Sequence, residues 1–134
     1  MIVERITSGI PGLDKLIEGG FVKGSSNLVA GTTGTGKTIL SCQYLLHGLQ
    51  KGENGIYVTL EQKEEDIIAD MGRFGWDVEL KKFINAGKLI VTSRFPSNIK
   101  ELTSEIVNLV KRNSAKRFVL DSISIATMGW KETA

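Results

Sequence analysis

The sequence has little cysteine, histidine or proline, with one cysteine, one histidine and two prolines in 134 residues. The single cysteine, Cys42, excludes an internal disulfide bond and fits a reducing compartment. The single histidine, His47, has no second metal ligand near it in the sequence, and we expect it to be structural or exposed. Because no stretch resembles a transmembrane helix or a signal peptide, we expect a cytoplasmic protein without a membrane partner.

A large excess of charge of one sign is also absent, because the formal net charge is +2. This balance gives no strong electrostatic surface for nucleic acid, which we therefore do not expect as a partner. We interpret the short basic pairs Lys81-Lys82, Lys111-Arg112 and Lys116-Arg117 as solvated helix ends. The length and a hydrophobic content of 41% predict a single globular domain, residues 1–134, with its own core.

The most informative stretch has the form G-x-x-x-x-G-K-[ST]. It follows residues 26–30, which are short and apolar enough for a buried strand, and it precedes residues 39–46, which have a helical pattern. A strand, a glycine loop and a helix in this order are the context that a phosphate-binding loop requires. The loop consists of Gly31, Thr32, Thr33, Gly34, Thr35, Gly36, Lys37 and Thr38.

The residue types of this loop match the chemistry of a bound triphosphate. Glycines let the backbone curl so that successive N–H groups face the phosphate oxygens. The following helix adds the positive end of its dipole and its unpaired first-turn N–H groups. Lys37 supplies a cation for the β- and γ-phosphates, and the Thr38 hydroxyl supplies a ligand for Mg²⁺. The loop therefore predicts a site for a nucleoside triphosphate with Mg²⁺.

Predicted strands and helices alternate along the rest of the chain. This alternation predicts an α/β fold with a mostly parallel sheet that helices cover on both faces. The predicted strands after the loop are residues 56–60, 88–92 and 117–121. The predicted helices run from the loop to about residue 50 and then over residues 63–75, 76–87 and 99–110.

Two acidic residues stand where predicted strands end, and the carboxyl ends of parallel strands meet at one edge of a sheet. Asp121 is predicted to hold Mg²⁺ through water while Thr38 contacts the ion directly. The alternative for Asp121 is a cap at the end of its strand. Glu61 is predicted to position or deprotonate the attacking water. The alternative for Glu61 is an exposed acid that opens the next helix.

Several stretches together resemble the KaiC-type domains of the RecA-like P-loop ATPase superfamily. Two of them are more specific than the phosphate loop: residues 7–14 with Gly19-Gly20, and residues 72–77. The stretch Tyr57 to Glu61 and the pair Asp121-Ser122 also match. The resemblance runs from about residue 6 to residue 125 without large gaps.

The resemblance implies a three-layer RecA-like P-loop NTPase fold, with ATP rather than GTP as the nucleotide. It implies an ATPase in which Glu61 and Lys37 are catalytic while Thr38 and Asp121 hold Mg²⁺. It also implies a homo-oligomer, often a hexameric ring with nucleotide between subunits. KaiC-type domains commonly carry two consecutive glutamates after the second strand, whereas here Gln62 takes the second position and leaves Glu61 as the matching carboxylate.

The chain departs from the RecA-like pattern after Asp121. Domains of this type place another strand, which comes later in the sequence, between the phosphate-loop strand and the Asp121 strand. A sheet without that strand leaves two rows of unpaired backbone groups, which is costly. Three arrangements stay open: a fragment of a longer protein, a strand inserted by a partner, or two strands that close up into a smaller sheet. We expect a C-terminally shortened domain.

Two functions stay open on these residues. The first is an ATPase that uses Glu61 to activate water. The second is a regulatory module that binds ATP without turnover, because the sensor strand and the cations supplied by a neighbouring subunit are missing. A small-molecule or nucleotide kinase is a third interpretation, which the absence of an arginine-rich lid late in the sequence disfavours.

Overall fold

The computed structural model of the chain describes residues 3–30 and 36–121. Its elements, in chain order, are β1 (Arg5–Ile6), α1 (Leu13–Leu16), β2 (Phe21–Val22), α2 (Lys37–Gln50), β3 (Gly55–Thr59), α3 (Glu64–Gly72), α4 (Asp77–Asn85), β4 (Leu89–Ser93), α5 (Ile99–Asn113) and β5 (Arg117–Asp121). Strands β1 and β2 pair with each other in antiparallel fashion, and the other three form a parallel sheet in the order β4-β3-β5. Among the described helices, every one is too short or too polar to cross a lipid bilayer.

Strand β3 is the centre of the parallel sheet, and all of its residues are buried. Four of its five residues are β-branched or aromatic, which suits a pleated surface that is covered on both sides. Thr59 at its end lies opposite Ser93 in β4 and Asp121 in β5. The carboxyl ends of the three strands therefore meet at one edge of the sheet, as the sequence predicts.

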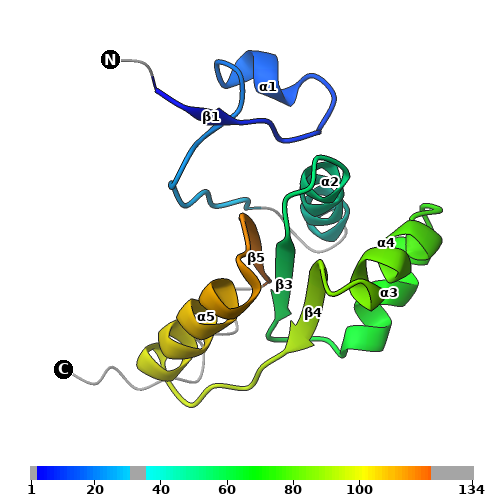
Figure 1. The fold of residues 1–134 in the computed structure, drawn as a ribbon, viewed down its shortest axis with the longest axis vertical. Helices are drawn as coiled ribbons and strands as arrows, with labels where there is room; N and C mark the ends of the chain where they lie inside the picture. Colours follow the sequence, from blue (N-terminus) through cyan, green and yellow to red (C-terminus); the bar gives the residue numbers. More distant parts are fainter. Residues whose placement is uncertain (1–2, 31–35, 122–134) are drawn as a thin grey trace.

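Helices cover both faces of this sheet (Figure 1). On one face, α2, α3 and α4 share a buried cluster with Tyr57 and Leu89. On the other face, Leu102 and Leu109 of α5 pack with Ile56 and Val58. Alternate residues of β3 thus enter opposite cores, and each fully buried aliphatic side chain contributes about 1.5–3 kcal/mol relative to an exposed one. These three layers confirm the predicted α/β architecture.

Residues 26–30 do not form the buried strand that the sequence predicts. Leu28 is 79% exposed, Val29 is 45% exposed, and neither lies in a strand. Within the described residues, β5 pairs with β3 alone, so residues 26–30 and β5 do not close up into a smaller sheet. An isolated extended segment gains no sheet hydrogen bonds and buries little apolar surface, so an apolar pattern does not by itself make a strand.

Arg117 is not part of a solvated helix end, which corrects the prediction for the pair Lys116-Arg117. It opens β5 and is 1% exposed, whereas Lys116 is exposed. Its Nε donates a hydrogen bond to Glu53 Oε1 (3.2 Å), and its Nη1 donates to the Tyr44 carbonyl oxygen (2.9 Å). The guanidinium carbon also lies 4.6 Å from the centre of the Tyr44 ring. These partners replace the water that a buried cation loses.

Gly48 in α2 leaves room for the buried Arg117 side chain. A Cβ at position 48 would lie 2.4 Å from Cδ and from Nε of Arg117. We therefore expect Gly48→Ala to lower the free energy of unfolding by about 1–3 kcal/mol, although alanine has the better helix propensity. Gly72→Ala in α3 is the matched control, because the nearest atom to its Cβ, Asp77 Cβ, would be 3.4 Å away. Urea denaturation checks both variants, and a Gly48→Ala protein as stable as the wild type would contradict the prediction.

Candidate functional site

The described part of the phosphate-loop motif lies at the start of α2. Gly36 has a φ of 86°, a left-handed conformation that glycine adopts without strain, and the helix begins directly after it at Lys37. No described side chain caps this end, so the first-turn N–H groups suit an anion. Lys37 and Thr38 stand in that first turn. The predicted loop residues Gly31, Thr32, Thr33, Gly34 and Thr35 lie outside the described residues.

Asp121 is held at the end of β5 by the phenol of Tyr57. Tyr57 Oη donates a hydrogen bond to Asp121 Oδ2 over 2.6 Å. The Thr38 side chain lies near enough to the same phenol to lower its pKa, against the larger effects that raise it. Burial and then this bond to Asp121 raise the pKa of Tyr57 above its ordinary value, so the hydroxyl keeps its proton at neutral pH. The structure thus brings together Thr38 of α2 and Asp121 of β5, two of the predicted site residues, around one buried hydroxyl.

Glu61 lies just beyond the carboxyl end of β3, in a short turn. Its N–H donates to Thr59 Oγ1 (3.3 Å), as does the N–H of Gln62 (3.0 Å), which fixes the direction in which the chain leaves the sheet. The N–H of Leu60 donates to the carbonyl oxygen of Asp121 (2.7 Å). Glu61 therefore follows at once after the point where β3 and β5 last bond. Its side chain is exposed and makes no ion pair within residues 3–30 and 36–121.

The donor set at this edge fits Mg²⁺ better than a metal enclosed by protein ligands. In the part of the chain that the structure describes, no group of three or more His, Cys, Asp or Glu side chains could hold a metal ion. Mg²⁺ differs from such metals because it usually takes one or two protein ligands, together with waters and substrate phosphates. The Thr38 hydroxyl and the Asp121 carboxylate, two oxygen ligands near the Tyr57 phenol, match that demand.

The cysteine and the histidine are not part of this chemistry. Cys42 is 1% exposed, and burial together with nearby carboxylates raises the pKa of its thiol to about 12, which keeps it protonated and inert at neutral pH. His47 Nε2 lies 2.9 Å from Thr7 Oγ1, and burial with nearby cations lowers the pKa of the imidazole. Cys42 is a core residue and His47 a structural one, as the sequence predicts.

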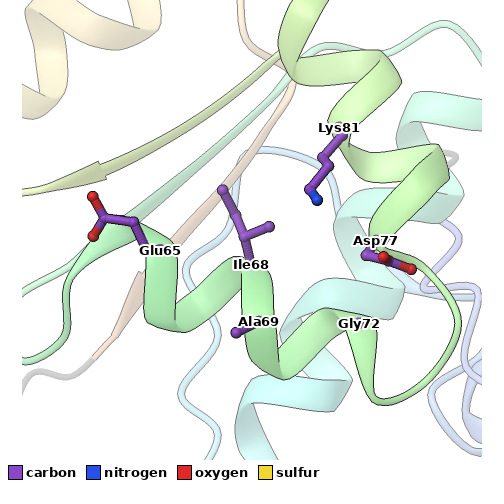
Figure 2. A pocket seen from close by; sticks show the side chains of 6 residues that line it. All are labelled: Glu65, Ile68, Ala69, Gly72, Asp77 and Lys81. Carbon is purple, nitrogen blue, oxygen red and sulfur yellow. The ribbon is translucent and has the colours of Figure 1, made fainter.

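A hollow between α3 and α4 is separate from these residues. Figure 2 shows the Lys81 side chain reaching from α4 towards Ile68 of α3 across it. The hollow is lined by Glu65, Ile68, Ala69, Gly72, Asp77 and Lys81. Because none of these is a predicted nucleotide, metal or catalytic residue, the hollow takes no part in the candidate site.

Sequence reasoning missed Tyr57 as a residue that organises the site, and it missed Arg117 as a buried residue of the fold. Tyr57 was expected as part of the strand at residues 56–60. Arg117 was expected as the basic first residue of the strand at residues 117–121 and as part of a solvated basic pair. One available signal was the hydroxyl of a tyrosine within an otherwise aliphatic buried strand, because such a group needs a buried partner.

Comparisons with known proteins identify the family of this chain. The family model described as "ATPase: KaiC" matches residues 6–133. The circadian clock protein KaiC3 of Synechocystis sp. is 35% identical over 132 residues, which cover 90% of this chain and 26% of that protein. The UPF0273 protein of Thermotoga maritima is 34% identical over 140 residues, covering 92% of this chain and 57% of that protein.

A solved structure has the same fold. The crystal structure of a KaiC-like protein from the hyperthermophilic archaeon Pyrococcus horikoshii OT3 superposes with a TM-score of 0.81 at 43% sequence identity. The match covers 91% of this chain and 55% of that one, so the chain spans only about half the length of this relative. The family model covers nearly the whole chain and the parallel sheet matches a KaiC-like structure, and the chain therefore belongs to the KaiC ATPase family.

Proposed function

We propose that the chain binds Mg·ATP at the loop of residues 31–38 and hydrolyses the ATP. The observation that carries this proposal is the placement of Asp121, which is hydrogen-bonded to the Tyr57 hydroxyl, near Thr38 in the first turn of α2. It occurs at the carboxyl ends of parallel strands, where open α/β sheets bind their ligands. P-loop enzymes hold Mg²⁺ with a hydroxyl from the helix after the loop and a carboxylate from a strand end. Membership of the KaiC ATPase family supports ATP as the nucleotide.

Each residue of the loop has a part in this binding mode. The backbone N–H groups of Gly31 to Gly36 would surround the phosphates, and Lys37 would neutralise the β- and γ-phosphate oxygens. Thr38 and Asp121 would hold Mg²⁺, which would offset the negative charge of the phosphates. The first turn of α2 adds the positive end of the helix dipole.

Glu61 is proposed to position the attacking water and accept its proton. The turn made by Thr59 fixes the backbone of Glu61 beside the last contact between β3 and β5. Alignment of the water and neutralisation of charge are the main contributions that side chains make to phosphoryl transfer. An exposed carboxylate at this edge of the sheet is suited to the first of these tasks.

An ATP-binding module without turnover is the second candidate function. It is favoured by one observation: residues 26–30, which lead directly into the loop, are exposed and lie outside the sheet. A loop whose preceding segment is not fixed in the sheet can bind phosphates without aligning the γ-phosphate with Glu61. Both candidates predict binding of Mg·ATP, and only the first predicts release of phosphate.

Lys37→Ala is expected to remove most of the stabilisation by Mg·ATP. A ligand present at 100 times its dissociation constant stabilises a protein by about 2.7 kcal/mol, and the loss of the phosphate-binding cation weakens that binding. Lys51→Ala is the matched control, because Lys51 follows the other end of the same helix. The melting temperature of each variant is measured with and without Mg·ATP. A shift in Lys37→Ala as large as that of the wild type would place the nucleotide elsewhere.

We also propose that residues 1–134 act as one ATP-binding domain and that copies of it associate. The family resemblance implies a homo-oligomer, with a hexameric ring as its usual form and nucleotide between subunits. Sedimentation velocity with and without Mg·ATP tests association directly. A monomer in both conditions would contradict it.

A further inference from the structure

We propose that Tyr57 is a positioning residue that fixes Asp121 for Mg²⁺ before the nucleotide arrives. This inference rests on the proposed binding of Mg·ATP and assigns a role to a residue outside the phosphate-binding motif. It is carried by the 2.6 Å hydrogen bond from Tyr57 Oη to Asp121 Oδ2. The Thr38 side chain, in the first turn of α2, lies near the same phenol. One buried group from the central strand therefore bonds Asp121 and lies near Thr38, the other residue proposed to hold the metal.

The register of the sheet explains how Tyr57 reaches Asp121. Tyr57 lies opposite Val119, and Thr59 lies opposite Asp121. Side chains two positions apart on a strand point to the same face, so Tyr57, Val119 and Asp121 share the face that α2 covers. A diagonal neighbour on an adjacent strand is within reach of a long aromatic side chain. The phenol therefore extends along this face and ends at the carboxylate beside the start of α2.

The packing of Tyr57 makes its hydroxyl a fixed point. The residue is 0% exposed and belongs to the same buried cluster as Cys42 and Leu45 of α2. A ring enclosed in this way keeps its rotamer, because interior side chains are close-packed. The position of the hydroxyl is therefore set by the core rather than by solvent or by the ligand. Groups that orient metal ligands in this way typically change metal affinity by about 10–100-fold when they are removed.

A purely structural role makes a different prediction. If the hydroxyl serves only as a satisfied buried donor, its removal lowers the stability of the fold and leaves the Mg²⁺ dependence of nucleotide binding unchanged. If it positions Asp121, its removal weakens the Mg²⁺-dependent part of ATP binding. The Mg²⁺ dependence of binding thus separates the two roles, and overall stability does not.

The test is a Mg²⁺ titration of ATP binding by wild type, Tyr57→Phe and Tyr44→Phe. The affinity for ATP is measured by calorimetry in EDTA and at increasing Mg²⁺. We expect Tyr57→Phe, which keeps the ring, to raise the Mg²⁺ concentration at the midpoint about tenfold and to leave binding in EDTA unchanged. Tyr44→Phe removes the hydroxyl of the second of the two tyrosines and should leave both quantities unchanged.

The outcomes separate this inference from the proposed function. A wild type that binds ATP neither in EDTA nor with Mg²⁺ overturns the proposed function. A wild type whose binding depends on Mg²⁺, beside a Tyr57→Phe variant with the same midpoint, overturns the role of Tyr57 alone. An equal change of the Mg²⁺ midpoint in Tyr44→Phe would also overturn it, because a general loss of core packing would then explain the effect.

A second measurement does not require Tyr57→Phe to fold. Because the chain has two tyrosines, Tyr44→Phe labelled with 3-fluorotyrosine carries one fluorine signal, at Tyr57. Addition of Mg²⁺ to the ATP complex is expected to shift this signal, since the charge next to the Tyr57 hydroxyl changes when Asp121 and Thr38 engage the ion. A signal that is the same with ATP in EDTA and with Mg·ATP overturns the inference.

Discussion

Arg117→Met is expected to lower the free energy of unfolding by about 3 kcal/mol. The substitution leaves the carboxylate of Glu53 and the carbonyl oxygen of Tyr44 without the guanidinium that lies 3.1 Å and 2.9 Å from them. Methionine fills much of the space, so the loss reports the broken interactions rather than a cavity. Because 26% of the Glu53 side chain is exposed, water can solvate its carboxylate after the substitution and offset part of the lost stability. The expected loss is therefore at the lower end of the range that is typical when one partner of a buried ion pair is removed.

The control for Arg117 is its exposed neighbour. Lys116→Met is expected to change stability by less than about 0.5 kcal/mol, because the Lys116 side chain is exposed. In the double variant Glu53→Gln with Arg117→Met, no unpaired carboxylate remains, so part of the stability should return. Urea unfolding measures all of these proteins. A loss in Arg117→Met no larger than that in Lys116→Met would show that the buried cation does not stabilise the fold.

Glu61→Gln is expected to lower ATP turnover by about 10²–10⁴-fold, the usual contribution of a positioned proton acceptor. Glutamine has nearly the same size and can still contact a water, but it cannot take up the proton that the attacking water releases. Binding of Mg·ATP should persist, because Glu61 is not among the residues proposed to contact phosphate or metal. The variant therefore separates the chemical step from binding.

Glu65→Gln supplies the comparison for this effect. Glu65 is another exposed acid of the same region, in the first turn of α3, and it should keep the wild-type rate. Phosphate release is followed at saturating Mg·ATP for the three proteins. Background rates that are equal in the wild type and in Glu61→Gln would reject hydrolysis and leave the ATP-binding module as the function.

Elements with strong local signals were predicted closely from the sequence. The strand at residues 117–121 and the helix that ends at residue 50 agree with β5 and α2, because apolar patterns and turn residues mark their limits. The strand predicted at residues 56–60 lies one residue earlier in the structure, at 55–59. Strand ends are set by pairing with β4 and β5, which no local pattern contains.

Features that depend on distant partners could not be predicted in this way. The apolar residues 26–30 matched a strand pattern, yet strand formation needs an adjacent edge to bond with. Arg117 appeared to be an exposed charge because its partner Glu53 is 64 positions away. Tyr57 and Asp121 are also 64 positions apart, and only the register of β3 and β5 brings them together.

The candidate site was predicted in part. The motif identified Thr38, and the strand pattern identified Asp121 as the acid at the end of its strand; the structure brings both to one phenol. The roles of Glu61, of Lys37 and of the loop residues stay predictions, because they concern a ligand and a reaction. Variants of these residues test them individually.

Calorimetric titration of the wild-type chain with Mg·ATP tests the central proposal most directly. The proposed site predicts saturable binding to a single site, weaker when EDTA removes the Mg²⁺ that Thr38 and Asp121 are proposed to hold. A folded chain that shows no saturable binding of Mg·ATP up to millimolar concentration would contradict the proposal.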